Sequence, residues 1–72
     1  MKVKKGGIYR HFKGHVYRVF GIGKHSETLE EYVIYINVNE ENDIWIRPKS
    51  MFLETITRDG KTFPRFELIE EL

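Results

Sequence analysis

The sequence predicts an all-β fold, a small SH3-like barrel or roll of five to six short antiparallel strands with one helical or 3₁₀ turn. Strand-forming residues are abundant, whereas Ala and Gln are absent. Short apolar stretches alternate with turn signals rather than with helices. With 72 residues, the chain has room for a single core. An oligonucleotide-binding-type barrel is the main competing architecture, and the SH3-like layout suits the length better.

The first two strands are expected to form a hairpin. Residues 8–12 alternate in polarity, and Lys13-Gly14 supplies a two-residue turn with Gly where φ can be positive. The second strand covers residues 15–22. Its adjacent apolar residues Val19 and Phe20, followed by Gly21, predict a bulge or a sharp bend.

The middle of the chain predicts two more strands with a polar turn between them. Residues 26–31 offer only one turn of helix, because a β-branched and aromatic run begins at once. That run, residues 32–38, is expected to be a strand buried largely on both faces. Residues 44–47 form the fourth strand, and Pro48 ends it.

The last third predicts one helical or 3₁₀ turn and a second hairpin. Residues 48–52 are too short for more than that turn, and we expect Met51 and Phe52 to belong to the core. Strands at 53–57 and 62–69 flank Asp59-Gly60, the strongest hairpin signal in the chain. Pro64 confines the final strand to an edge or a bulge.

The chain is expected to be one domain over residues 1–72, compact over about 6–69, with a short basic N-terminal tail and a fraying acidic end. Without cysteine it has no disulfide, thiolate zinc site or cysteine nucleophile. No signal peptide or membrane span is visible, so a cytoplasmic location and no membrane partner are expected. So small a domain leaves little room for a large catalytic cleft.

The near-neutral charge conceals an asymmetry, because 12 basic residues oppose 11 acidic ones but occupy different parts of the chain. Residues 1–26 contain seven bases and no acid, and every acid lies from Glu27 onward. Basic and acidic strands can neutralise one another across a sheet, or a basic patch can remain exposed and bind a partner.

Trp45 and Arg47 are the strongest candidates for a binding surface. They share a strand face opposite Ile44 and Ile46, so if the isoleucines are core, an indole and a guanidinium stand together outside or at a barrel mouth. Such pairs are enriched at interaction hot spots. The alternative is structural: Trp45 plugs an open end while Arg47 pairs with Glu54 or Glu30.

The three histidines carry weaker signals. His11 shares a face with Tyr9, and both are further ligand candidates. With a two-residue turn, His11 and His15 project on opposite faces and cannot chelate, so no metal site is predicted.

His25 and Glu27 flank Ser26 and precede Thr28, a group of residues that is suited to catalysis. Adjacent strand residues face opposite ways, however, so turn capping by Ser26 and Thr28 explains the group better. His25 and Glu27 stay among the ligand candidates.

Several short blocks follow one another over residues 6–69. They are Gly7-Ile8-Tyr9-Arg10-His11-Phe12-Lys13-Gly14, Tyr17-Arg18-Val19, Lys24-His25-Ser26-Glu27-Thr28-Leu29-Glu30, Trp45-Ile46-Arg47-Pro48, Met51-Phe52-Leu53-Glu54 and Pro64-Arg65-Phe66. In this order the blocks resemble the pattern of domain-of-unknown-function family 1653, small and mostly bacterial proteins. The resemblance implies an SH3-type barrel and lends no activity, substrate or catalytic residue. Gly23 stands where Ala is common in the family.

Three classes of function remain open. The leading prediction is a noncatalytic module that binds a peptide, a partner protein or a small anionic ligand through an aromatic and arginine surface. The alternatives are a nucleic-acid-binding barrel that uses Lys13, Arg18 and Lys24, and a minimal enzyme built on His25 and Glu27. No cofactor is implied, and a monomer is expected because the edge strand at 62–69 is blunted.

Overall fold

The computed structural model describes residues 3–71 and folds them into seven strands and one short helix. The elements are β1 (Ile8–His11), β2 (Val16–Lys24), β3 (Glu31–Asn37), β4 (Ile44–Pro48), α1 (Lys49–Phe52), β5 (Thr55–Arg58), β6 (Lys61–Pro64) and β7 (Phe66–Glu70). The predicted basic tail and fraying end include residues 1–2 and 72, which lie outside the described part.

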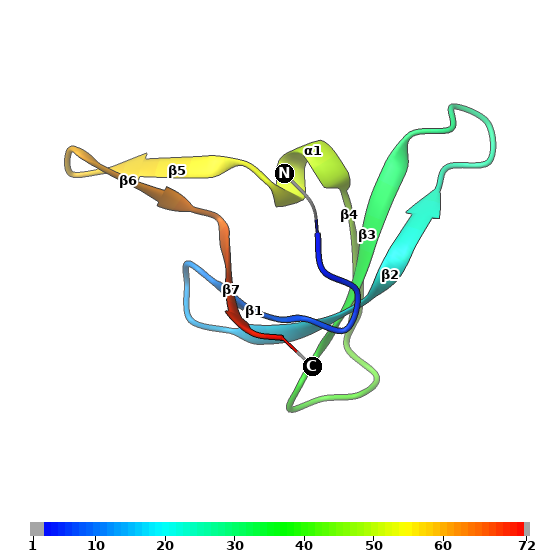
Figure 1. Cartoon of the computed structure of the whole chain (residues 1–72), viewed down its shortest axis with the longest axis horizontal. Helices are drawn as coiled ribbons and strands as arrows, with labels where there is room; N and C mark the ends of the chain where they lie inside the picture. Colours follow the sequence, from blue (N-terminus) through cyan, green and yellow to red (C-terminus); the bar gives the residue numbers. More distant parts are fainter. Residues whose placement is uncertain (1–2, 72) are drawn as a thin grey trace.

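Five of these strands form one antiparallel sheet in the order β4-β3-β2-β1-β7, and β5 and β6 form a separate hairpin (Figure 1). The all-β prediction is confirmed, together with the single helical turn. Barrel closure is not found among the described strands, since β4 and β7 are the two edges of an open sheet. The reason is that β5 and β6 pair only with each other and project from the sheet instead of joining its edges.

The first hairpin has a different register from the predicted one. The His11 N–H donates to the His15 carbonyl at 2.8 Å, and the Gly14 N–H donates to the His11 carbonyl at 2.7 Å. The loop therefore has three residues, Phe12, Lys13 and Gly14, with Gly14 at a φ of +107°. The predicted two-residue turn was wrong, and His11 faces His15 across the hairpin.

Other local predictions hold. The β2–β3 register shifts between Val19 and Gly21, which confirms the bulge. Asp59 and Gly60 have φ values of 51° and 76°, as a two-residue primed turn requires, and Arg58 lies opposite Lys61.

The expected strand at 62–69 is in fact two strands. β6 ends at Pro64, the Arg65 N–H donates to the Glu54 carbonyl at 2.9 Å, and β7 then pairs with β1 in the main sheet. The Phe12 N–H also donates to the Arg65 carbonyl at 2.9 Å. Arg65 is therefore the corner at which the chain passes from the hairpin into the sheet.

The core lies on one face of the sheet, called here the inner face. Its buried residues are Tyr9, Tyr17, Val19, Val33, Tyr35, Phe52 and Phe66. The Phe52 ring stacks on the Phe66 ring with centroids 4.1 Å apart and planes 8° apart. Phe52 is 1% exposed whereas Met51 is 42% exposed, so α1 supplies one core ring and not the predicted two residues.

Charge neutralisation across the sheet is present in the described residues. The ion pairs are Lys4–Glu71, Arg10–Glu67, Lys49–Glu31 and Arg65–Glu54. Two of them join the basic first third of the chain to its acidic end. Within residues 3–71, the only helix is the four-residue α1, so no described helix has the length and apolar character needed to cross a membrane.

Candidate functional site

The two faces of β4 are the reverse of those assumed from the sequence. Trp45 lies opposite Tyr35 and Arg47 lies opposite Val33, so both share the inner face with the core. Ile44 and Ile46 are on the outer face, where they are 58% and 67% exposed. The assumption that the isoleucines are core was wrong, because the register with β3 turns the indole and the guanidinium inward.

A hollow of about 270 Å³ opens on the inner face, beside the part that α1 covers. We call it the cationic hollow, and its lining is His11, Lys13, His15, Tyr17, Tyr35, Trp45, Arg47 and Phe66. No acidic residue is part of this lining. The structure thus brings together three of the predicted ligand candidates, His11, Trp45 and Arg47, and with them Lys13, a candidate of the nucleic-acid alternative.

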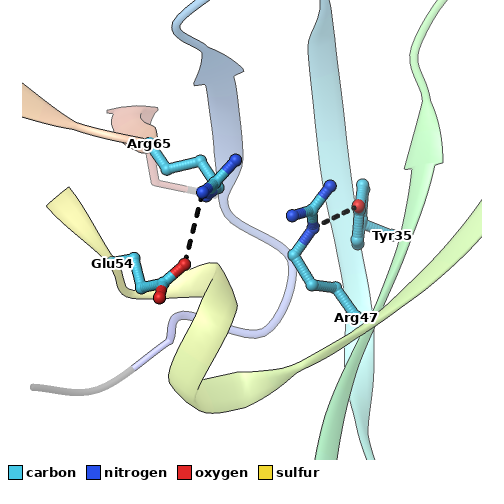
Figure 2. Close-up of polar contacts among 4 residues, drawn as sticks. All are labelled: Tyr35, Arg47, Glu54 and Arg65. Atoms are coloured by element: carbon cyan, nitrogen blue, oxygen red, sulfur yellow. Dashed lines mark hydrogen bonds and ion pairs between the residues drawn. The ribbon is translucent and has the colours of Figure 1, made fainter. Parts of the chain in front are cut away.

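Arg47 is oriented by aromatic neighbours and not by a carboxylate. Its Nε donates to the Tyr35 hydroxyl at 3.3 Å (Figure 2). Its guanidinium carbon lies 5.7 Å from the centroid of the Phe66 ring. Among the described residues no carboxylate pairs with Arg47.

The plug alternative is therefore wrong for both residues. Glu54, a predicted partner of Arg47, bonds to Arg65 at 3.3 Å (Figure 2), and Glu30 forms no described ion pair. Trp45 is 47% exposed, so it borders the hollow without closing it.

The surroundings of His11 disfavour its protonated form. Partial burial lowers its pKa below the usual 6.5, and the nearby positive charges of Arg47, Arg65, Lys13 and His15 lower it further. The Nδ1 atom accepts a hydrogen bond from the Lys13 N–H at 3.1 Å. The ring proton is therefore on Nε2, so that His11 presents a donor.

Tyr17 is the other lining residue with a displaced pKa. Burial raises the pKa of its hydroxyl, Tyr35 and Asp43 raise it further, and Arg47 acts in the opposite direction. Its ring meets the Tyr35 ring edge-on, with centroids 5.0 Å apart. Tyr17 thus keeps its proton and forms a neutral aromatic wall.

His11 and His15 both line the hollow, which contradicts the prediction that they project on opposite faces. The three-residue loop places the two residues opposite each other. Among residues 3–71, no group of three or more His, Cys, Asp or Glu side chains could hold a metal ion.

His25 and Glu27 lie in the β2–β3 loop and do not line the cationic hollow. The His25 Nδ1 accepts from the Glu27 N–H at 3.2 Å and from the Thr28 N–H at 3.3 Å. The Thr28 hydroxyl accepts from the Glu30 N–H at 3.2 Å, so Thr28 caps the turn as predicted. The sequence interpretation missed that the imidazole itself is a cap.

The remaining candidates are dispersed. Tyr9 is buried in the core, where its hydroxyl accepts from the Lys4 N–H at 2.9 Å. Lys13 lines the hollow, Arg18 lies opposite Ile36 on the outer face, and Lys24 ends β2. These three bases do not share one exposed face.

Sequence reasoning missed His15, Tyr17, Tyr35 and Phe66 as lining residues. The spacing of His11 and His15 could have indicated their common face. Two residues that flank a three-residue hairpin loop lie opposite each other, so their side chains are on the same face of the sheet. The three aromatic residues read as ordinary core positions, and only the sheet order brings them beside Trp45.

Comparison with known proteins identifies relatives. The sequence profile of a family described as a protein of unknown function, DUF1653, matches residues 7–68. The crystal structure of a protein from Bordetella bronchiseptica belonging to DUF1653 superimposes with a TM-score of 0.81 and 28% sequence identity, covering 93% of this chain and 88% of that one. None of the curated proteins matches. The predicted family resemblance is confirmed.

Proposed function

We propose that this chain, which belongs to the DUF1653 family, is a noncatalytic module that binds a small anionic ligand with a flat group in the cationic hollow. The anionic group contacts Arg47, His11 and Lys13. The flat group packs against Trp45. The family description names no activity, so the proposal rests on the geometry of the hollow.

The observation that carries the proposal is the state of Arg47. A guanidinium has five N–H donors, and the one hydrogen bond that the Arg47 side chain makes to the described residues uses only Nε. Arg10 and Arg65 each pair with a glutamate, whereas Arg47 has no described carboxylate partner. Planar guanidinium groups bind carboxylates and phosphates through two parallel hydrogen bonds. An anion in the hollow completes this arrangement.

The half-exposed indole of Trp45 supports the flat group. Trp45 stands two residues before Arg47 on the same strand face, so a ring bound against the indole lies beside the guanidinium. Aromatic side chains contribute strongly to binding when a ligand covers them. Tyr17 and Tyr35, which meet edge-on, form a rigid wall next to this position.

The lining supports binding more than catalysis. It contains no carboxylate, and its hydroxyls are tyrosines. His11 has its Nδ1 atom engaged by a backbone N–H and presents Nε2–H as a donor. Such a neutral imidazole orients a ligand anion without removing a proton from it.

The test is a titration of the protein with inorganic phosphate, benzoate and a single-stranded oligonucleotide. Trp45, the single tryptophan, reports binding through its fluorescence and its indole NMR signal. We expect benzoate to shift the Trp45 and Arg47 side-chain signals and to raise the pKa of His11. Arg47→Gln is expected to weaken benzoate binding about tenfold or more, which corresponds to about 1.4 kcal/mol.

Arg18→Gln is the matched control, since it removes an arginine from the outer face. Equal benzoate affinity in Arg47→Gln and the unaltered protein would overturn the proposal, as would the absence of any shift at millimolar anion. Oligonucleotide binding that falls equally in both arginine variants and fades with salt would support the nucleic-acid-binding alternative instead.

A further inference from the structure

The edge strand β4 leaves backbone hydrogen-bonding groups unpaired. In an antiparallel pair, residues alternate between those bonded to the neighbouring strand and those whose N–H and C=O point away. The Asn37 N–H donates to the Asp43 carbonyl at 3.0 Å, which fixes the alternation. Trp45 and Arg47 therefore bond to β3, whereas Ile44 and Ile46 direct their backbone groups to the free edge. Pro48 is also at a position whose backbone groups point to the free edge. This agrees with the alternation, because Pro48 has no N–H to donate to β3.

The side chains protect this edge only in part: Arg47 and Pro48 are residue types that discourage further pairing, whereas Ile44 and Ile46 are not. Sheet edges are usually guarded by charged residues, bulges or a covering element. Ile44 and Ile46 are exposed instead, and the β3–β4 register has no described shift. Ile46 also borders an apolar hollow of about 260 Å³ that includes Tyr32 and Ile34. The combination of open backbone groups and exposed isoleucines is typical of a strand that receives another strand.

We propose that β4 pairs antiparallel with β4 of a second copy of this chain, so that the two sheets become continuous across a twofold axis. Such an interface is self-complementary, since each copy offers the same strand. The proposal goes beyond ligand binding and rests on the β4 edge, although Trp45 and Arg47 belong to both sites.

The register follows from the hydrogen-bond phase. Ile44 of one copy lies opposite Ile46 of the second copy, and the reverse pair forms across the axis. Trp45 then meets Trp45 of the second copy in a non-hydrogen-bonded pair, where side chains approach most closely. The register shifted by two residues places Ile44 opposite Pro48, which cannot donate, and moves Asp43 away from Arg47 of the second copy.

Charge complementarity favours a second copy over an unrelated strand. When Ile44 lies opposite Ile46 of the second copy, Asp43 lies opposite Arg47 of the second copy. The reverse pair, Arg47 with Asp43 of the second copy, forms on the other side of the axis. The Asp43 carboxylate accepts one described hydrogen bond, from Asn37 Nδ2 at 3.2 Å, so it has capacity for more. Arg47 has no carboxylate partner among the described ion pairs. The dimer thus contains two symmetry-related ion pairs, each between Asp43 of one copy and Arg47 of the other.

The edge has only five residues, so we expect a weak dimer that forms between micromolar and millimolar concentration. Sedimentation over this range is expected to show the mass rising from one chain to two, without any ligand. Hydrogen exchange adds a positional readout. The Ile44 and Ile46 amides are expected to become protected as concentration rises, while the Trp45 and Arg47 amides are protected throughout.

Ile46→Lys is expected to abolish the rise in mass, since it places a charge at the centre of the paired edge. Ile69→Lys is the matched control, because Ile69 is 41% exposed on β7, the opposite edge strand, and it is expected to leave the dimer intact. Well-dispersed amide spectra of both variants establish that they fold.

Three results would overturn the proposal. They are a single-chain mass at millimolar concentration, a dimer that survives Ile46→Lys, and concentration-dependent protection on β7 instead of β4. Trp45 and Arg47 line both this interface and the cationic hollow, so benzoate binding is also measured in the monomeric Ile46→Lys variant, where loss of the dimer and loss of anion binding are distinguishable.

Discussion

Two regions of the inner face differ although they belong to the same strands. Next to α1, the sheet is covered, and Val33 and Phe52 are buried. One residue pair further along β3 and β4, Tyr35 and Trp45 border the cationic hollow, whose lining includes no residue of α1. The difference arises because α1 has only four residues, so its single core ring covers part of a sheet that is wider than the helix.

This comparison separates stability from binding. In the covered region, apolar surface removed from water contributes to folding. In the open region, the indole is half-exposed, and we expect its removal to affect the fold less than removal of a buried ring. The following predictions test whether changes in the covered region alter mainly the stability of the fold, and changes in the open region alter it little.

The largest effect is expected from Phe52→Ala, which removes the ring stacked on Phe66 in the covered region. We expect a loss of about 3–5 kcal/mol in the free energy of unfolding, measured by urea titration. Trp45→Ala, the matched aromatic truncation in the open region, is expected to cost about 1 kcal/mol or less. Similar losses for the two variants would mean that Trp45 is part of the core.

A second prediction concerns the pH dependence of stability, to which the open region contributes through His11. The pKa of His11 is lower in the folded protein than the usual 6.5. As the pH falls below 6.5, the unfolded chain therefore takes up the His11 proton at a higher pH than the folded protein does. The free energy of unfolding is therefore expected to fall as pH decreases from 6.5 through the folded pKa. Urea titrations of the protein and of His11→Gln over this range are expected to show a shallower slope in the variant. Identical slopes would contradict the prediction.

The smallest effect is expected from Glu54→Gln at the boundary of the two regions. This change removes the ion pair between Glu54 and Arg65. Because the Glu54 side chain is half-exposed, we expect the free energy of unfolding to fall by only about 0.5 kcal/mol. Because Arg65 lies near His11, losing its glutamate is expected to lower the pKa of His11, measured by NMR titration. An unchanged His11 pKa would show that the corner and the hollow are electrostatically separate.

Predictions from the sequence hold where the signal is local. Asp59 and Gly60 fix their own turn through positive φ values, and the bulge at Val19-Phe20-Gly21 follows from a local break in alternation. The family resemblance was likewise recognised from blocks of residues.

The errors arise where the outcome depends on distant pairing. Alternation shows that Trp45 and Arg47 share a face, but only the register with β3 decides which face is inner. The first hairpin could close with two or three loop residues, and the choice moves His15 from one face to the other. The same holds for the six ligand candidates. Three of them line the hollow, namely His11, Trp45 and Arg47. The other three lie elsewhere, which only the fold could show: Tyr9, His25 and Glu27.

The projecting hairpin of β5 and β6 has a consequence for the hollow (Figure 1). It leans on Phe12, whose ring lies 5.1 Å from the Arg58 guanidinium carbon, and it ends at Arg65, whose backbone bonds to Phe12. Phe12 adjoins His11 in the chain, and their rings are 4.5 Å apart. Through these contacts the hairpin is connected to the His11 imidazole, which lines the cationic hollow. A displacement of the hairpin is therefore expected to change the position of one side chain of the proposed binding site.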